Sequence, residues 1–150
     1  MAKGRDMYDV FGPAEESRIE NAIAQAELQT SGEIRVHIDN KCKENVLDRA
    51  AFLFEELEMH QTDLRNGVLI YLAIQDKKLA IIGDAGINAK VEKDFWNEIK
   101  TQMINDCVEE RFVDAVVNAV LSTGKQLTTH FPYQKDDQNE LPNQISFGKS

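Results

Sequence analysis

One aspartate lies between glycines at the end of an apolar run, in the stretch "IIGDAGI" that contains Asp84. A second polar stretch, "TDLRNG", directly precedes another apolar run. Carboxylate, amide and carbonyl oxygens are the ligands of hard cations, and calcium takes about six to eight of them. These residue types therefore predict a divalent-cation site, with Ca²⁺ favoured over Mg²⁺ because several protein oxygens are on offer. The candidate metal ligands are Asp84, Asp63, Glu33 and Asn66.

The same residues also have interpretations that need no metal. An aspartate in a Gly-Asp-x-Gly turn often bonds its own backbone. Arg65 can pair with Asp63 or Asp84 and fill the space that a cation would need. With a cation present, Asp84 and Arg65 would instead suit a phosphatase, because the metal polarises a phosphoryl oxygen and the guanidinium clamps it. The sequence contains no EF-hand loop, nucleophile elbow or zinc-protease helix, so the catalytic residues of any enzyme stay unknown.

The hydrophobic pattern predicts alternating helices and strands around these residues. The strand at 33–39 alternates, and its wetter face carries Glu33, Arg35 and His37. The run at 68–74 is apolar on both faces, which is typical of a central strand covered by helices. The expected helices are 12–28, 45–60, a helix capped by Asn88 that continues through Met103, and 111–131; the expected strands are 33–39, 68–74 and 79–83.

Chain direction decides where the polar stretches meet. A strand–helix–strand crossover makes the first two strands parallel, and the short connection "QDKK" makes the third strand antiparallel to the second. The starts of the first two strands and the end of the third therefore share one edge of the sheet. We expect Ser31, Glu33, Arg65 and Asp84 to lie at that edge.

The composition favours one globular domain and argues against several classes of partner. The chain has 150 residues, of which 42% are hydrophobic, and its net charge is −9. Nucleic acid needs clustered lysine and arginine, so no nucleic-acid partner is expected. No apolar run approaches the roughly 20 residues of a membrane span, and the N-terminus lacks the apolar core of a signal peptide. We therefore expect a cytoplasmic protein without membrane contact, and we favour a monomer.

The cysteines and His37 give no second candidate site. Cys42 and Cys107 lie outside any metal-binding spacing, so two free thiols are expected, with Cys107 in the core and Cys42 at the surface. His37 is expected to be a surface residue of its strand, because no second His or Cys stands near it.

Several ordered motifs together resemble the TPM domain family, which is named for a thylakoid-lumen protein, a photosystem II repair protein and a modulator of a levamisole receptor. The similar runs are "AIAQAELQTSGEIRVHI", "TDLRNGVLIYLAIQDKKLAIIGDAGI" and "RFVDAVVNAV", and the likeness spans residues 12–131. The resemblance implies a three-layer α/β/α sandwich whose mixed sheet has three to four strands. A fourth strand would come from "MYDVF" or from the C-terminal segment.

The resemblance also implies functions for this chain. It implies divalent-ion binding near the loops at the sheet edge, where Asp84 corresponds first and Asp63, Asn66 and Glu33 follow. It implies a weak acid phosphatase activity as one alternative. A third possibility is a non-catalytic module that docks an unknown protein partner through its acidic surface or a helix face.

The expected organisation is a single domain with short extensions. Residues 1–11 form an N-terminal segment, residues 12–131 the TPM-like domain and residues 132–150 a flexible polar tail. Many relatives carry a signal peptide, a membrane helix or a glycine-rich tail, and this chain looks like a short soluble form without them. We expect a TPM-domain protein that binds a divalent cation and whose cellular role is unassigned.

Overall fold

The computed structural model describes residues 5–92, 94–133 and 140–148, and a four-stranded mixed sheet forms its centre. The strand order is β3-β2-β1-β4, with β1 parallel to both β2 and β4 and with β3 antiparallel to β2. The strands are β1 (Glu33–Asp39), β2 (Gly67–Ala73), β3 (Lys78–Gly83) and β4 (Ser146–Phe147). The expected mixed sheet is confirmed. Its fourth strand comes from the C-terminal segment, whereas "MYDVF" is largely helical.

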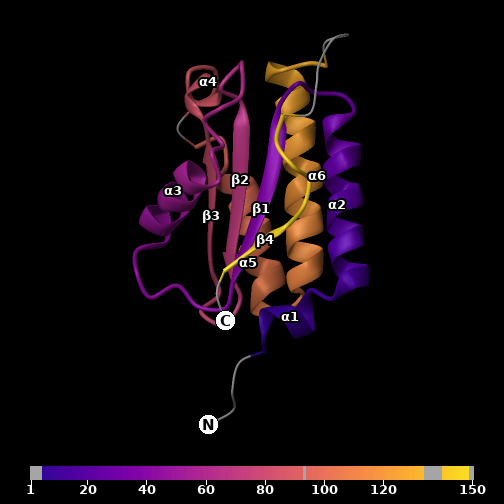
Figure 1. Cartoon of the computed structure of the whole chain (residues 1–150), viewed down its shortest axis with the longest axis vertical. Coiled ribbons are helices and arrows are strands. Elements are labelled where there is room, and N and C mark those ends of the chain that lie inside the picture. The colour runs from indigo at the N-terminus through magenta and orange to yellow at the C-terminus, as the bar shows by residue number, and fades with distance from the viewer. Residues whose placement is uncertain (1–4, 93, 134–139, 149–150) are drawn as a thin grey trace.

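Helices cover both faces of this sheet, as Figure 1 shows. The helices are α1 (Met7–Val10), α2 (Pro13–Glu27), α3 (Val46–Glu56), α4 (Ala85–Asn88), α5 (Asn97–Val108) and α6 (Phe112–His130). Helices α1, α2, α5 and α6 pack on one face, and α3 packs on the other. This is the α/β/α sandwich that the sequence predicts. Within the described ranges, no helix has both the length and the apolar character that crossing a membrane requires.

The central strand β2 is buried along its whole length, as its uninterrupted apolar sequence predicts. Successive side chains of a strand point to opposite faces, so β2 contributes to two separate cores. Its Val68, Ile70 and Leu72 join the core under α2, α5 and α6. Its Leu69 and Tyr71 join the core under α3. The two cores hold the sheet rigid between the helical layers.

The face of β1 that carries Glu33 and His37 is covered by other segments, although the alternating sequence predicts that this face is the wetter one. The backbone amide of Leu141 donates to Oε1 of Glu33 at 2.6 Å. The hydroxyl of Ser146 lies 2.9 Å from Nδ1 of His37, and only 3% of His37 is exposed. Both partners lie in segment 140–148, so residues about a hundred positions away cover a face that local alternation assigns to solvent.

The described part of the C-terminal segment is packed, which differs from the flexible polar tail expected over residues 132–150. Leu141 and Ile145 are buried in the two cores, on opposite faces of the sheet. β4 then adds residues 146 and 147 to the free edge of β1. Three apolar side chains in an otherwise polar stretch are too few to give a periodic signal in the sequence.

Two other local expectations were wrong. The predicted third helix is interrupted: Asp84 caps the short helix α4, which ends at Asn88, and α5 begins only at Asn97. Cys42 is buried against α3 rather than exposed, because its backbone amide donates to the side chain of Asp76. Cys107 lies in the core as expected.

Helices α2 and α6 approach each other closely at Gly124. A Cβ atom added to Gly124 would lie 2.5 Å from Cβ of Ala26 and 3.0 Å from its Cα. Glycine disfavours helix, and the sequence alone suggests only a weak point in α6. The structure gives this glycine a packing role, because a larger residue would push the two helices apart.

Replacement of Gly124 by alanine should therefore destabilise the chain, although alanine is the better helix former. We expect the free energy of unfolding to fall by about 1–3 kcal/mol, the usual effect of overpacking. Denaturation in urea measures the change. Ser122→Ala, at an exposed position of the same helix, serves as the control and should leave stability unchanged or slightly higher. A Gly124→Ala chain more stable than the control would contradict the packing role.

Candidate functional site

The polar stretches that the sequence singles out do meet at one edge of the sheet, which we call the amino edge (residues 31–33, 62–67 and 83–88). Glu33 pairs with Gly67 in the parallel ladder. The next residue of β2, Val68, pairs with Gly83 in the antiparallel ladder. The backbone amide of Asp84 then donates to the carbonyl of Gly67 at 3.0 Å. Strand direction thus brings the start of β1, the start of β2 and the end of β3 together.

Asp84 forms a two-pronged ion pair with Arg65 at this edge. Nε of Arg65 donates to Oδ2 of Asp84 at 2.8 Å, and Nη2 donates to Oδ1 at 2.8 Å. The carboxylate is buried, with 5% exposed, whereas about half of the Arg65 side chain is exposed. The hydrogen bonds that Arg65 donates to Asp84 raise the pKa of Arg65 above its usual value. Asp84 also caps α4, because Oδ1 accepts the backbone amide of Ala85 at 2.7 Å. The sequence left an Arg65–Asp84 pair as an alternative to a metal site, and this pair is present in the structure.

Two loops cross in direct contact beside this ion pair. The backbone amide of Gly86 donates to the carbonyl of Arg65 at 2.9 Å. A Cβ atom at residue 86 would overlap the carbonyl oxygen of Leu64, so only glycine allows the crossing. Arg65 itself has a positive φ of 51°, which is uncommon for a residue with a side chain. The crossing therefore places the carbonyl oxygens of Leu64 and Arg65 against Gly86, two residues from Asp84.

The other three candidate ligands reach the amino edge but make separate contacts. Glu33 accepts the amide of Leu141, as described above. Nδ2 of Asn66 donates to the carbonyl of Ser31 at 3.0 Å, which ties the starts of β1 and β2 together. Asp63 is exposed. Within residues 5–92, 94–133 and 140–148, no three His, Cys, Asp or Glu side chains cluster closely enough to hold a metal ion.

Two glutamates next to this edge, the buried Glu33 and the half-buried Glu27, hold their protons more tightly than usual. Burial raises the pKa of Glu33 to about 7. Burial, together with the nearby charge of Glu33, raises the pKa of Glu27 to about 7. Oε2 of Glu27 accepts the amide of Ile34 at 2.8 Å, so both carboxyl groups anchor the start of β1. The amino edge is therefore sensitive to pH near neutrality.

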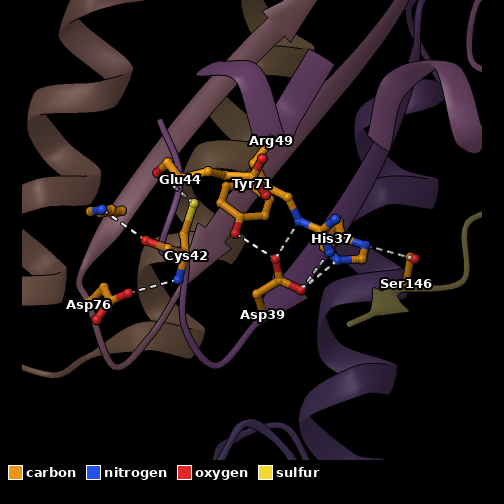
Figure 2. Close-up of polar contacts among 9 residues, drawn as sticks. His37, Asp39, Cys42, Glu44, Arg49, Tyr71, Asp76 and Ser146 are labelled. Carbon is orange, nitrogen blue, oxygen red and sulfur yellow. Dashed lines mark hydrogen bonds and ion pairs between the residues drawn. The ribbon is translucent and has the colours of Figure 1, made fainter. Parts of the chain in front are cut away.

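A second polar cluster lies at the opposite edge, which we call the carboxyl edge (residues 37–43 and 146–148), and the sequence did not predict it. The register of the sheet places Tyr71, His37 and Ser146 in one row across β2, β1 and β4. His37 uses both ring nitrogens: Nδ1 lies 2.9 Å from Oγ of Ser146, and Nε2 lies 2.9 Å from Oδ1 of Asp39. Figure 2 shows these contacts.

Asp39 is the centre of this cluster. Oδ2 accepts the hydroxyl of Tyr71 at 2.6 Å and Nε of Arg49 at 3.0 Å (Figure 2). Burial alone would raise the pKa of Asp39, but hydrogen bonds from His37, Arg49 and Tyr71 outweigh it and hold that pKa well below its usual range. Burial and the bond to Asp39 raise the pKa of Tyr71. Asp39 is thus a buried carboxylate that stays ionised because three donors surround it.

A cavity of about 560 Å³ opens beside this cluster. Its lining includes His37, Asp39, Arg49 and Ser146. The volume falls in the range of small-molecule sites, about 300–1,000 Å³. In open α/β sheets ligands bind outside the carboxyl ends of parallel strands, where the chain continues to opposite sides. The cavity lies at the carboxyl ends of the parallel strands β1 and β4.

Part of the signal for the carboxyl edge was present in the sequence. His37 and Asp39 are two positions apart on one strand, so they must lie on the same face. The sequence could not assign Ser146 to this cluster, because Ser146 lies 109 positions from His37 and its strand has only two residues.

Comparison with known proteins identifies relatives of the chain. A family model for the TPM domain matches residues 5–126. No curated protein matches the chain at a significant level. The NMR structure of the BA42 protein from the psychrophilic bacterium Bizionia argentinensis is similar to this chain, with 41% sequence identity and a TM-score of 0.88. That match covers 99% of this chain and 100% of the other.

A second solved structure supports the fold at much lower identity. It is the solution NMR structure of the N-terminal domain of the cg2496 protein from Corynebacterium glutamicum, with 11% identity and a TM-score of 0.63. The match covers 84% of this chain and 85% of the other chain. At this identity the likeness concerns the fold alone.

The raised pKa of Glu33 predicts how stability depends on pH. An acid whose pKa is higher in the folded state than in the unfolded state binds an extra proton on folding, so stability falls as pH rises between the two values. For Glu33 this window runs from about 4.5 to about 7. Glu33→Gln keeps the acceptor for Leu141 and removes the charge. Its free energy of unfolding relative to the unaltered chain should rise through this window, by on the order of 1 kcal/mol after allowing for solvent screening.

Urea denaturation at a series of pH values measures this difference. Glu55→Gln, at an exposed position on α3, is the matched control and should show no such trend. A constant difference between pH 4.5 and 7 for Glu33→Gln would contradict the raised pKa.

Proposed function

The chain belongs to the TPM domain family, and we propose that it binds a divalent cation, Ca²⁺ in preference to Mg²⁺, at the amino edge with Asp84 as the central ligand. The observation that carries the proposal is the buried carboxylate of Asp84 at the crossing of two loops. A buried carboxylate needs a compensating positive charge, and its attraction to that charge is strong in a poorly solvated site. The crossing adds carbonyl oxygens, which suit a hard cation.

The cation would bind by exchange with Arg65. Both oxygens of Asp84 accept from this guanidinium, so a metal and Arg65 compete for the same carboxylate. About half of the Arg65 side chain is already exposed, so it can turn into solvent without leaving a hole in a core. Asp84 therefore has a positively charged partner before and after the exchange, which lowers the electrostatic cost of releasing Arg65.

Other oxygens of the amino edge would complete the coordination. Asp63 is exposed and lies on the loop that crosses α4, so its carboxylate is free to turn toward a cation at Asp84. Asn66 would contribute its side-chain oxygen, since its nitrogen already bonds Ser31. Glu33 would contribute only after releasing Leu141, and it fits least well. Such a mixed set from two loops matches the flexible coordination of Ca²⁺ better than the strict octahedron of Mg²⁺.

The exchange gives a second candidate function, metal-assisted hydrolysis of small phosphate esters. Arg65 would be released beside the metal, and a guanidinium next to a divalent cation can clamp a phosphoryl group. Release of p-nitrophenol from its phosphate ester tests this activity. It should require Ca²⁺ or Mg²⁺ and should vanish in both Asp84→Asn and Arg65→Ala. Hydrolysis that persists in either variant would rule out this site.

Substitutions of the two partners should change cation affinity in opposite directions. Asp84→Asn removes the charged ligand and should weaken Ca²⁺ binding by more than about tenfold. Arg65→Ala removes the competitor and should tighten binding. Trp96 provides the readout, because it is buried and its ring lies 3.2 Å from the Cβ position of Gly83, next to Asp84. It is also the only tryptophan in the chain.

The control variant is Asp9→Asn, which removes an exposed carboxylate in α1 and should leave the affinity unchanged. Backbone amide shifts during the same titration should be largest from residue 83 to 87 and in the loop around Arg65. Shifts spread over the whole acidic surface would contradict the proposal. Weaker binding in Arg65→Ala would contradict the exchange, and a flat titration would favour the interaction module.

A further inference from the structure

We propose that the carboxyl edge is an acyl-transfer site, in which Ser146 is the nucleophile, His37 its general base and Asp39 the residue that positions His37. The three side chains form one chain of hydrogen bonds, with 2.9 Å at each step (Figure 2). They border the cavity described above. A serine, histidine and aspartate in this order are recognised by their geometry and roles and not by their positions along the sequence.

The hydrogen bonds fix the direction of proton transfer. Asp39 stays ionised, and an ionised carboxylate only accepts hydrogen bonds. Nε2 of His37 must therefore carry the hydrogen that Asp39 accepts. In neutral imidazole the other nitrogen, Nδ1, then has a lone pair, and the hydroxyl of Ser146 donates to it. The nucleophile's proton thus already points at the base that would remove it.

The surrounding structure holds this arrangement in place. His37 and Tyr71 are neighbours in the ladder and stack with their ring centroids 5.9 Å apart. His37 and Asp39 are each at least 95% buried, so water does not compete for their bonds. Arg49 and Tyr71 fix the far oxygen of Asp39. Ser146 is only half-buried and lines the cavity, so a substrate can reach its Oγ.

The cavity walls indicate the class of substrate. Apolar surface comes from Phe52, Leu53, Leu57 and Phe147, which suits a short apolar acyl group. Lys41 and Lys43 also line the cavity, and their positive charge would stabilise the oxyanion of a tetrahedral intermediate. An ester of a small aliphatic acid fits these features.

The reaction balances with water as the second substrate. Oγ of Ser146 attacks the carbonyl carbon of the ester while its proton passes to Nδ1 of His37. The bond from that carbon to the leaving oxygen breaks, and the proton on Nδ1 goes to the departing alcohol. Water then gives a proton to Nδ1 of His37 as its oxygen attacks the acyl carbon. The bond from that carbon to Oγ of Ser146 breaks, Oγ takes the proton from Nδ1, and the carboxylic acid leaves. No residue of the amino edge takes part.

A fluorophosphonate probe tests the activated serine without knowledge of the natural substrate. Such a probe forms a bond from the serine oxygen to phosphorus and loses fluoride, which intact-mass measurement detects. The unaltered chain should be labelled once, at Ser146, and should hydrolyse p-nitrophenyl butyrate. Ser146→Ala should lose both reactions, and His37→Gln should slow both by about a hundredfold, the usual contribution of a general base.

The matched control is Ser122→Ala, which removes an exposed serine of α6 and should leave labelling and hydrolysis unchanged. Circular dichroism checks that each variant folds. If His37→Gln does not fold, Ser146→Ala alone still tests the proposal. A chain that the probe does not label would overturn the proposal. Equal labelling of the unaltered chain and Ser146→Ala, or of native and heat-unfolded chain, would overturn it as well.

Discussion

Strand β1 lies inside the sheet with a parallel neighbour on each side, and this direction decides which polar groups can meet. Parallel strands start at one edge and end at the other, so Glu33 at the start of β1 joins the crossing loops around Asp84. Asp39 at its end joins Tyr71 from β2 and, through His37, Ser146 from β4. Both polar clusters follow from the same hydrogen-bonded ladder. The apolar cores on either side keep that ladder rigid.

Each edge buries one aspartate against one arginine, and the two pairs differ in how completely the carboxylate is held. Among the residues that the structure describes, Asp84 has one charged partner, Arg65, whose side chain is half exposed. Asp39 has Arg49 and also the ring of His37 and the hydroxyl of Tyr71. A carboxylate with several buried donors resists a change of partner, because all of these donors would lose their hydrogen bonds at once. Asp39 is therefore suited to fix a neighbour, whereas Asp84 is suited to change partners.

The amino edge was predictable from the sequence and the carboxyl edge was not, for a physical reason. The length of each connection predicts the direction of the next strand. One crossover and one hairpin are therefore enough to place Arg65 and Asp84 at the same edge of the sheet. The sequence even left the Arg65–Asp84 pair open as an alternative, and the pair exists. The burial of His37 depends on segment 140–148, which reaches β1 from the far end of the chain. The alternation of apolar and polar residues along β1 indicates which residues share a face, but it does not indicate which segment covers that face.

The Arg65–Asp84 ion pair also bears on which cations the proposed site would select. A net charge of −9 attracts any cation to the surface, but such exposed charges are screened by salt and distinguish poorly between ions. At the proposed cation site, an incoming cation would compete with the Arg65 guanidinium, which already donates two hydrogen bonds to Asp84. The apparent affinity for the cation would be lowered by the fraction of molecules in which Arg65 remains bound to Asp84. A monovalent cation offers Asp84 no more charge than Arg65 does, whereas a divalent cation offers twice as much. Competition by Arg65 would therefore select against monovalent ions at the proposed site while leaving their diffuse binding elsewhere unaffected.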